Sequence, residues 1–298
     1  MARSDDRVVA VSAAMIDGTG LRRFNVEFPD KTFDVGIAEQ NAVAFASGLA
    51  LNGLKPVVAL YSTFLQRAYD QVLSEVGLQN LPIVFAVDRA GITGKDGETH
   101  QGQFDISYLN LVPNMTILSP RDETALRQML RYAFSLDQPV AIRYPRGNVP
   151  KLDILSTESF VPEPQIVREG KDIVIFTDGN MFEVAMKAAE ILEFSNISSA
   201  VCDLRILKPL DRNKIEKISL QHKCVVTIED GTIYGGVGST ISSILSESGI
   251  YTINIGWPDK YIQHGSVSEL RQLFGLDADS VAKKIKDFYE EKTGCFTN

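Results

Sequence analysis

Short apolar segments rich in β-branched residues alternate with helical patterns along the chain, and this alternation limits the folds it can adopt. In the first half, strands are predicted at Val8–Ser12, Pro56–Tyr61, Pro82–Val87, Met115–Leu118 and Val140–Arg143. Helical patterns lie between them, at about 38–51, 64–77 and 122–135. Strands that alternate with helices form parallel sheets whose crossover connections are helical. An α/β domain is therefore predicted for the first half.

The second half repeats the alternation. Strands are predicted at Ile173–Thr177, Ala200–Leu204, Val225–Glu229 and Thr252–Ile255, and helices near 181–194, 211–218, 237–247 and 277–291. A stretch rich in proline and polar residues, from Pro145 to Pro164, separates the halves and is typical of a linker. We expect a first domain at 1–150, a linker at 151–165 and a second domain at 166–298. Each domain is expected to contain a mostly parallel sheet flanked by helices.

Composition excludes several classes of function. The 298 residues carry a net charge of -8 and no arginine- and lysine-rich stripe, which argues against nucleic-acid binding. No segment approaches the roughly 18 apolar residues that span a bilayer, and the first residues lack the apolar core of a secretory signal. We therefore expect a cytoplasmic protein with no membrane partner. Cys202, Cys224 and Cys295 lack metal-site spacing, and Cys202 and Cys224 are predicted to be buried strand residues.

Glu39 lies near the start of the helical pattern at 38–51. The apolar stripe of this pattern contains Ala42, Val43, Ala46, Leu49 and Ala50, so the spacing places Glu39 on the buried face. A charged carboxylate is costly to bury unless a partner stabilises it or it takes up a proton, and either outcome is typical of a functional site. The pattern equally allows Glu39 to turn outward or to form a structural ion pair with an arginine such as Arg67.

Tyr61 ends the predicted strand at 56–61, and Phe64 and Arg67 follow it. Phe64 and Arg67 lie on a different helix face from the core stripe of Leu65, Ala68, Val72, Leu73 and Val76. Ligands bind beyond the carboxyl ends of strands in open α/β sheets, so this position is a candidate binding site. The alternative is that Phe64 only packs locally and Arg67 is a solvated surface charge.

A long polar loop, from Asp88 to Gly102, follows the next predicted strand and contains four glycines. Glycines let a backbone approach a ligand closely, and long polar loops at strand ends are usually functional or mobile. Asp96 and His100 lie in this loop. Histidine can donate a hydrogen bond to a carboxylate substrate and transfer protons near neutral pH. A mobile loop without function remains the alternative.

Arg146 follows a further strand, in the segment Arg143-Tyr-Pro-Arg-Gly147. Its guanidinium matches phosphate or carboxylate oxygens, so Arg67 and Arg146 are candidates for binding one phosphate together. An interdomain salt bridge is the alternative for Arg146. The glycine-rich segment Thr227–Ser239 lacks the full spacing of a phosphate loop, and we assign it, like His264, a structural role.

Several motifs together resemble 1-deoxy-D-xylulose-5-phosphate synthase. They are Asp34-Val-Gly-Ile-Ala-Glu-Gln40, Tyr61-Ser-Thr-Phe-Leu-Gln-Arg67, Asp88-Arg-Ala-Gly-Ile92, Asp96-Gly-Glu-Thr-His-Gln-Gly102, Arg143-Tyr-Pro-Arg-Gly147, Leu207-Lys-Pro-Leu-Asp211, Gly235-Gly-Val-Gly-Ser239 and Pro258-Asp-Lys-Tyr-Ile-Gln-His-Gly265. The resemblance covers nearly the whole chain but only the C-terminal portion of that enzyme. It implies a pyrimidine-binding domain followed by a transketolase-type C-terminal domain.

Members of that family use thiamine diphosphate to join a two-carbon fragment of pyruvate to glyceraldehyde 3-phosphate, with loss of carbon dioxide. By resemblance, Glu39 would hydrogen-bond N1′ of the aminopyrimidine and favour the imino tautomer that deprotonates thiazolium C2. Phe64 would stack on the pyrimidine, and Met15 would line the cofactor pocket. The substrates would be surrounded by Tyr61, Arg67, Asp96, His100 and Arg146, with His100 and Asp96 holding pyruvate.

The resemblance also implies a divalent metal, Mg²⁺, bound with the diphosphate through a Gly-Asp-Gly segment, and this sequence contains no such segment. We therefore expect Mg²⁺ to be held by a pyrophosphate-binding domain or subunit outside this sequence, and no metal ligands within it. The chain could be one subunit of a split synthase, a fragment of a longer chain, or a non-catalytic binding or regulatory module. We also expect a homodimer, because this architecture generally buries large faces between paired subunits.

Two positions depart from the family pattern, and two enzymes compete with the synthase. Asn41 replaces the usual histidine after Ala-Glu-Gln, and Glu98 replaces a residue that is more often neutral. Asn41 would alter the support behind Glu39, and Glu98 would add negative charge near anion sites. Transketolase and the β subunit of 2-oxo acid dehydrogenase share the domain order and are the alternatives.

Overall fold

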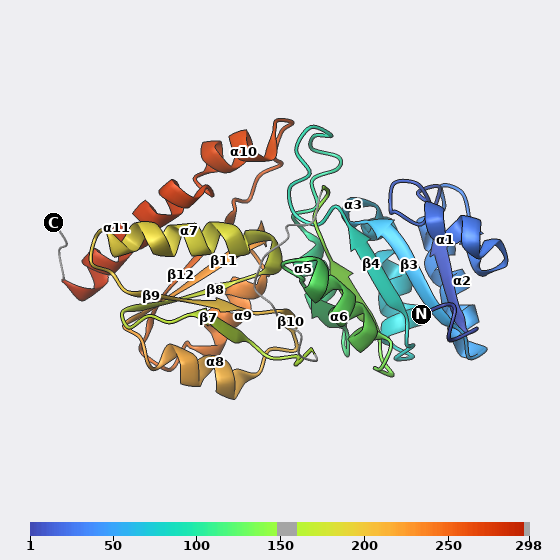
Figure 1. Cartoon of the computed structure of the whole chain (residues 1–298), viewed down its shortest axis with the longest axis horizontal. Helices are drawn as coiled ribbons and strands as arrows, with labels where there is room; N and C mark the ends of the chain where they lie inside the picture. Colours follow the sequence, from blue (N-terminus) through green and yellow to red (C-terminus); the bar gives the residue numbers. More distant parts are fainter. Residues whose placement is uncertain (148–159, 295–298) are drawn as a thin grey trace.

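The computed structural model describes residues 1–147 and 160–294, which form two α/β lobes side by side (Figure 1). The first sheet has the strand order β10-β5-β6-β4-β3-β1-β2, and the second has the order β12-β11-β8-β9-β7. All neighbouring strands are parallel except two pairs, β10 with β5 and β7 with β9. The predicted fold class, two mostly parallel sheets flanked by helices, is confirmed.

The first lobe contains the elements up to residue 143. Its strands are β1 (Val8–Ser12), β2 (Thr32–Asp34), β3 (Lys55–Tyr61), β4 (Val84–Asp88), β5 (Thr116–Leu118) and β6 (Val140–Arg143). Its helices are α1 (Arg22–Glu27), the 3₁₀ turn η1 (Pro29–Lys31), α2 (Glu39–Leu51), α5 (Asp105–Asn110) and α6 (Glu123–Ala133). All five residues of β1 are buried, as expected for a parallel strand covered on both faces.

The segment predicted as one helix at 64–77 is irregular. It consists of α3 (Ser62–Leu65), the 3₁₀ turn η2 (Gln66–Ala68), α4 (Tyr69–Gln71) and the π-helical η3 (Val72–Gly77). Tight 3₁₀ and wide π turns change the helical pitch, and they are frequent beside functional sites. The expected core stripe is nevertheless kept, because Leu65, Ala68, Val72 and Val76 are all buried.

The second lobe is built on the remaining strands. They are β7 (Gln165–Arg168), β8 (Ile173–Thr177), β9 (Ser199–Asp203), β10 (Ile206–Lys208), β11 (Cys224–Thr232) and β12 (Tyr251–Trp257). The helices are η4 (Gly179–Met181), α7 (Phe182–Glu193), α8 (Arg212–Ser219), α9 (Val237–Ile244), α10 (Val267–Phe274) and α11 (Ala278–Thr293). Cys202 and Cys224 are free thiols buried in β9 and β11, as predicted.

One strand of the second half belongs to the first sheet. β10 pairs antiparallel with β5, and the Lys208 ammonium donates to the carbonyls of Asn110 and Val112. The expected linker at 151–165 lies outside the described residues as far as residue 159, and Gln165 is already in β7. The division into domains therefore stays a prediction. The two lobes are joined at β10, a segment of the second half that forms the edge strand of the first sheet.

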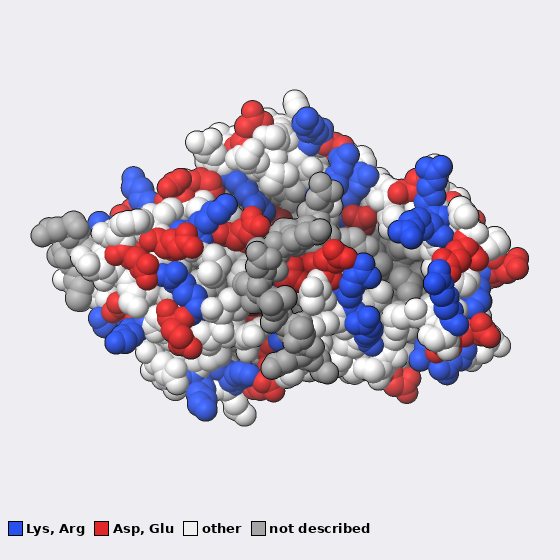
Figure 2. Space-filling model, in the orientation of Figure 1, with Lys and Arg blue, Asp and Glu red and all other residues white. Residues whose placement is uncertain are grey.

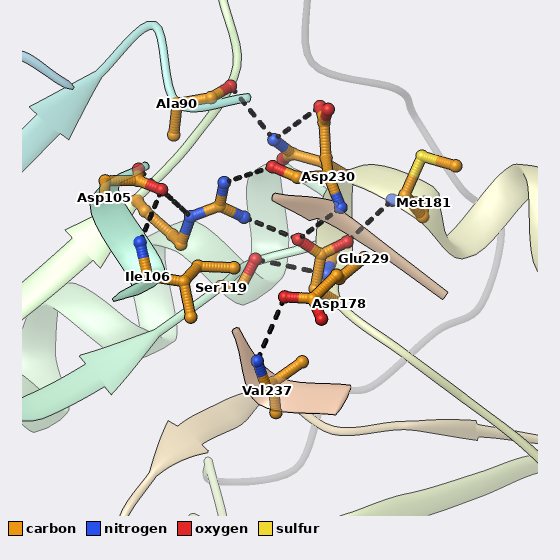
Figure 3. A network of polar contacts seen from close by, with 12 residues as sticks. Ala90, Asp105, Ile106, Ser119, Asp178, Met181, Glu229, Asp230 and Val237 are labelled. Atoms are coloured by element: carbon orange, nitrogen blue, oxygen red, sulfur yellow. Dashed lines mark hydrogen bonds and ion pairs between the residues drawn. The ribbon is translucent and has the colours of Figure 1, made fainter. Parts of the chain in front are cut away.

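Arg143, at the end of β6, connects the lobes through buried charges. Figure 3 shows three of the residues that surround it, Asp105, Asp178 and Asp230. Its Nε donates to Asp105 at 3.2 Å, Nη1 to Asp178 at 2.5 Å and Nη2 to the carbonyl of Asp230 at 2.8 Å. The side chains of Arg143, Asp105 and Asp178 have no exposed surface. Burial alone would lower the pKa of Arg143, but the two carboxylates keep that pKa above its ordinary value.

The pKa values of the acidic groups around Arg143 are raised as well, and here burial is the cause. Burial raises the pKa of Asp178 to about 6, although the charge of Arg143 counteracts the rise. Burial also raises the pKa of Glu229 to about 7. The Glu229 carboxylate accepts from the backbone N–H groups of Val237 and Gly238, both at 3.0 Å, at the start of α9. The N–H groups that a phosphate would need in the glycine-rich segment are thus already bonded to the Glu229 side chain. This agrees with the structural role assigned to the segment.

No helix in the described part of the chain is both long and apolar enough to cross a membrane. On the face shown in Figure 2, basic and acidic side chains are interspersed.

Removing the Arg143 guanidinium should destabilise the protein strongly. Arg143→Ala leaves Asp105 and Asp178 buried without their counter-charge, and we expect the free energy of unfolding to fall by about 3–5 kcal/mol. Urea denaturation followed by circular dichroism measures this change. Arg127→Ala, which removes an exposed i,i+4 pair with Glu123, is the control and should cost less than about 1 kcal/mol. Equal losses in the two variants would contradict the role assigned to Arg143.

Candidate active site

The candidate site lies beyond the carboxyl ends of β1, β3 and β4, on the first lobe. Tyr61 ends β3, Asp88 ends β4, and Met15 follows β1. This edge is where parallel sheets bind ligands, because the loops that leave the strands converge there. Gly18, in the loop after β1, approaches Tyr61 so closely that an added Cβ would lie 1.8 Å from the Tyr61 hydroxyl. Met15 is buried in the core of this lobe.

Glu39 is the first residue of α2, and its side chain is only 3% exposed. The Glu39 side chain thus points into the protein, as its spacing in the helical pattern predicts. Arg67, from η2, donates from Nη1 to Glu39 Oε2 at 2.6 Å, while its own side chain is 48% exposed. None of the described residues donates a hydrogen bond to Glu39 Oε1. The ion pair considered as an alternative is therefore formed, and it still leaves one carboxylate oxygen free to bind another group.

Three aromatic rings pack together next to this pair. The Tyr61 and Phe64 rings stack with centroids 5.4 Å apart, and the Phe64 and His100 rings meet edge to face at 5.2 Å. Phe64 precedes Arg67 by three residues, about one helical turn, so the two side chains lie on the same side of this segment. The His100 Nδ1 is 2.9 Å from the Thr99 hydroxyl. Phe64 and His100, which are 36 positions apart in the sequence, are thus brought into contact.

Arg89 extends the cluster toward the cleft between the lobes. Its guanidinium lies 3.7 Å from the centroid of the Tyr61 ring and donates to the Tyr61 hydroxyl at 2.8 Å. Asp96 Oδ2 accepts from Arg89 at 2.7 Å and from Arg146 at 2.6 Å. Partial burial would raise the pKa of Asp96, but the hydrogen bond from Arg146 and the charges of both arginines lower that pKa below its ordinary value.

A cleft of about 500 Å³ opens beside the Arg89–Asp96–Arg146 group. Arg89, Arg146 and Asp88 line it from the first lobe, and Asn180 and Arg271 line it from the second. Burial raises the pKa of Asp88 to about 6, against the effects of the Arg89 N–H group and charge. The cleft therefore offers guanidinium groups to an anion at the boundary between the lobes.

The loop from Asp88 to Gly102 is held in place by contacts with itself and with the second lobe. The buried Gln101 side chain accepts from the N–H groups of Thr93 and Gly94, and it donates to the Gln263 carbonyl. In Figure 1 this loop rises beside the loop that precedes α10. Gly91 has a positive φ of 74°, and an added Cβ there would lie 2.0 Å from the Asp230 carboxylate. The loop is thus shaped by glycines and anchored, as a binding loop requires.

The structure joins some of the predicted site residues and separates others. Tyr61, Phe64 and His100 form one cluster, whereas Asp96 binds the two arginines Arg89 and Arg146 and makes no hydrogen bond to His100. Arg67 and Arg146 contact different carboxylates, those of Glu39 and Asp96, and their joint binding of one phosphate stays a prediction. Arg146 also does not form the interdomain salt bridge given as its alternative, because its partner lies in the first lobe.

Sequence reasoning overlooked Arg89. The available signal was its position directly after a predicted strand, in the segment Asp88-Arg-Ala-Gly-Ile92. Its left-handed backbone, with φ of 58°, turns the chain so that the side chain lies over Tyr61, and residue type does not reveal such a conformation. Within residues 1–147 and 160–294, no group of three or more His, Cys, Asp or Glu side chains is arranged to bind a metal ion.

The Glu39–Arg67 pair can be tested by a double-mutant cycle. Arg67→Met leaves the buried carboxylate without its partner, and we expect the free energy of unfolding to fall by about 1–3 kcal/mol. Glu39→Gln combined with Arg67→Met removes both charges, and it should recover most of that loss. Urea denaturation at pH 7 measures each variant. Additive effects of the two substitutions would mean that the ion pair does not contribute to stability.

Comparison with known proteins places this geometry in a family. The family model described as "Transketolase, pyrimidine binding domain" matches residues 1–151, and "Transketolase, C-terminal domain" matches residues 163–281. A split-gene transketolase, solved as an inactive β4 tetramer, superposes with a TM-score of 0.88 at 29% identity and covers 97% of this chain and 94% of its own. A Pichia stipitis transketolase has a TM-score of 0.82 at 18% identity over 99% of this chain and 45% of its own, which supports the fold.

Curated relatives named 1-deoxy-D-xylulose-5-phosphate synthase are more similar in sequence. The protein of Caldanaerobacter subterraneus subsp. tengcongensis is 50% identical over 99% of this chain and 48% of its own length. The protein of Chlorobaculum tepidum is 48% identical over 98% of this chain and 47% of its own length. The chain spans about half the length of these relatives. The predicted resemblance to the C-terminal portion of that synthase is confirmed, and the chain belongs to the family of the transketolase pyrimidine-binding domain.

Proposed function

We propose that this chain supplies the pyrimidine-binding half of the active site in a thiamine-diphosphate-dependent synthase. The reaction would condense pyruvate and glyceraldehyde 3-phosphate to 1-deoxy-D-xylulose 5-phosphate with loss of carbon dioxide, in the cytoplasm. The single observation that carries the proposal is the buried Glu39 carboxylate beside the cluster of Tyr61, Phe64 and His100. The names of the relatives support the substrates.

The residues at the site fit an aminopyrimidine. Glu39 Oε1 accepts no hydrogen bond from the described residues, and the buried side chain holds it where it can share a proton with a ring nitrogen. The half-buried Phe64 offers an aromatic surface for stacking on a flat heterocycle. When bound, thiamine diphosphate supplies the acidic thiazolium carbon that adds to the ketone of pyruvate and accepts the electron pair left by decarboxylation.

Glu39 and Arg67 act together in this proposal. Glu39 would hold the proton at N1′ of the pyrimidine, because its burial and its place at the start of α2 fix the direction of the carboxylate. Arg67 stabilises the carboxylate through Oε2 and leaves Oε1 for the ligand. This assignment gives Arg67 a positioning role, in place of the phosphate contact suggested by its sequence position.

The phosphate of the aldehyde is better matched by Arg89 and Arg146. Both line the cleft, and both donate to the same Asp96 oxygen, so their guanidinium groups lie close enough to bind one phosphate. The Arg146 side chain is 47% exposed and can turn from Asp96 to a ligand. His100, at the edge of the Phe64 ring, is our candidate for a hydrogen bond to the carboxylate of pyruvate.

The diphosphate and Mg²⁺ would be bound by a pyrophosphate-binding domain or subunit. We propose that the chain is active only in complex with that partner, as a homodimer of the assembled unit. Two alternatives differ in outcome. A transketolase would use ketose phosphate donors in place of pyruvate, and a binding or regulatory module would form the complex without turnover.

A reconstitution assay tests this proposal and the role of Glu39. The chain, mixed with a pyrophosphate-binding partner, thiamine diphosphate and Mg²⁺, should form 1-deoxy-D-xylulose 5-phosphate, and Glu39→Gln should lower kcat by about 100-fold or more because the shared proton is lost. Glu247→Gln, at an exposed position, is the matched control and should behave like the wild type. Turnover by the chain alone, or an unchanged rate for Glu39→Gln, would refute these assignments.

The phosphate site can be separated from the pyruvate site by kinetics. Arg146→Met and Arg89→Met should each raise KM for glyceraldehyde 3-phosphate by roughly tenfold or more, because a charge-assisted hydrogen bond is lost. KM for pyruvate should change little, and the difference from wild type should disappear with unphosphorylated glyceraldehyde. Arg131→Met, at an exposed position of α6, is the control. If Arg67→Met alone raised KM for the phosphorylated aldehyde, the phosphate would bind at Arg67.

A further inference from the structure

The chain directly after Arg89 is held by side chains of the second lobe. The Asn180 amide, from η4, donates from Nδ2 to the Ala90 carbonyl at 3.2 Å. The Asp230 carboxylate, from β11, accepts from the Ile92 N–H group at 3.2 Å. The Ile92 side chain itself is buried in the hydrophobic core of the second lobe. A segment of the first lobe that begins one residue after Arg89 is therefore bonded to, and packed into, the second lobe.

Gly91 lies between these two contacts and ties them to the far end of the site loop. Its backbone, with φ of 74°, passes against the Asp230 carboxylate. The Gly91 N–H group donates to the Gly102 carbonyl at 2.9 Å, and the Gly102 N–H group donates to the Gly91 carbonyl at 2.6 Å. Both ends of the loop thus meet at the point where the second lobe holds it.

Arg89 needs such support because of its backbone. Its φ of 58° is left-handed, a conformation that residues other than glycine adopt only at a cost in free energy and keep only where the surroundings impose it. The first lobe holds the Ala90 N–H group, which donates to the Tyr144 carbonyl at 3.0 Å. The second lobe holds the Ala90 carbonyl through Asn180. Contacts from both lobes therefore set the direction in which the Arg89 guanidinium lies over Tyr61.

The second-lobe groups are themselves fixed before any ligand binds. The buried Asp230 carboxylate accepts from the Trp257 indole at 2.7 Å, and its Oδ2 accepts from the same Asn180 amide at 3.3 Å. The Ala90 carbonyl and the Asp230 side chain therefore lie next to each other (Figure 3). The Arg271 guanidinium lies 3.8 Å from Asp230 and donates to the Asn180 carbonyl. One amide group thus connects a rigid part of the second lobe to the chain that carries Arg89.

We propose that Asn180 and Asp230 are positioning residues, which hold the Arg89 guanidinium in the geometry that binds the phosphate of the aldehyde. They act through the backbone of residues 90–92 and not by contact with the substrate. Arg143 and β10 already join the lobes through other contacts, so the Asn180 amide is not needed for that purpose. This inference rests on the proposed function, because it starts from the assignment of the phosphate to Arg89 and Arg146.

Kinetics of the reconstituted enzyme test this role. Asn180→Ala should raise KM for glyceraldehyde 3-phosphate roughly three- to tenfold, the effect of one lost hydrogen bond. We expect kcat, KM for pyruvate and KM for unphosphorylated glyceraldehyde to stay within about twofold of wild type. When Arg89 is already replaced by Met, Asn180→Ala should change KM by less than about twofold, because both substitutions affect the same guanidinium.

Asn254→Ala is the matched control. Asn254 is half-buried like Asn180, lies in the same lobe, and donates through its amide to the Ser242 hydroxyl at 2.9 Å. The control should lower the urea midpoint of unfolding about as much as Asn180→Ala does, since each variant loses a comparable hydrogen bond. It should leave KM for glyceraldehyde 3-phosphate unchanged.

Hydrogen–deuterium exchange of the full chain gives a second readout that needs no turnover. Asn180→Ala should speed the exchange of the segment at residues 89–92 by roughly fivefold or more, because the segment opens more often once one of its anchors is lost. Asp230→Asn keeps the shape of the side chain but replaces one accepting oxygen with a donor, and it should act in the same direction. Asn254→Ala should exchange at this segment like the wild type.

The possible results separate this inference from the proposed function. If Arg89→Met raises KM for the phosphorylated aldehyde and Asn180→Ala does not, the positioning role is wrong and the proposed phosphate site stands. The role is also wrong if Asn180→Ala raises KM for both aldehydes alike, if its effect multiplies fully with that of Arg89→Met, or if exchange at residues 89–92 is unchanged. If Arg89→Met leaves KM unchanged, or the wild type shows no turnover, the proposed function fails and this inference fails with it.

Discussion

The buried guanidinium of Arg143 is the interaction on which the arrangement of the two lobes depends. It contacts Asp105 from α5, Asp178 at the end of β8 and the Asp230 carbonyl in β11, all without exposure to water. An unpaired charge at this position would be too costly to bury, so these elements must meet with their hydrogen bonds formed. Asp230 also connects this network to the site loop. Its carboxylate accepts hydrogen bonds from the Ile92 N–H group in that loop and from the Trp257 indole of the second sheet. The loop that carries Asp96 and His100 is thereby fixed relative to both sheets.

The site itself holds its charges in pairs that a ligand can enter. Glu39 is buried, but its partner Arg67 is half-exposed, and Asp96 is shared between the less exposed Arg89 and the half-exposed Arg146. In each case the deeper group fixes the geometry and the outer arginine can reorient without loss of its hydration. Such an arrangement limits the cost of keeping acidic and basic groups ready for a substrate, since neither charge is left unpaired before binding.

The sequence alone determined the class of fold and the bounds of β1, β6 and β8, because continuous apolar runs and helical spacing are local properties. Its helical spacing indicated an inward direction for Glu39 but left the outward direction open, and the tertiary structure decided between them. It could not determine that Ile206–Lys208 would leave its own half to pair with β5, or that Arg143 would join the lobes. Nor could it show that Arg67 pairs with Glu39 while Arg146 pairs with Asp96, or that the Arg89 guanidinium lies over the Tyr61 ring. These features depend on which segments meet in three dimensions and on a left-handed backbone at one residue, and neither is encoded in local periodicity.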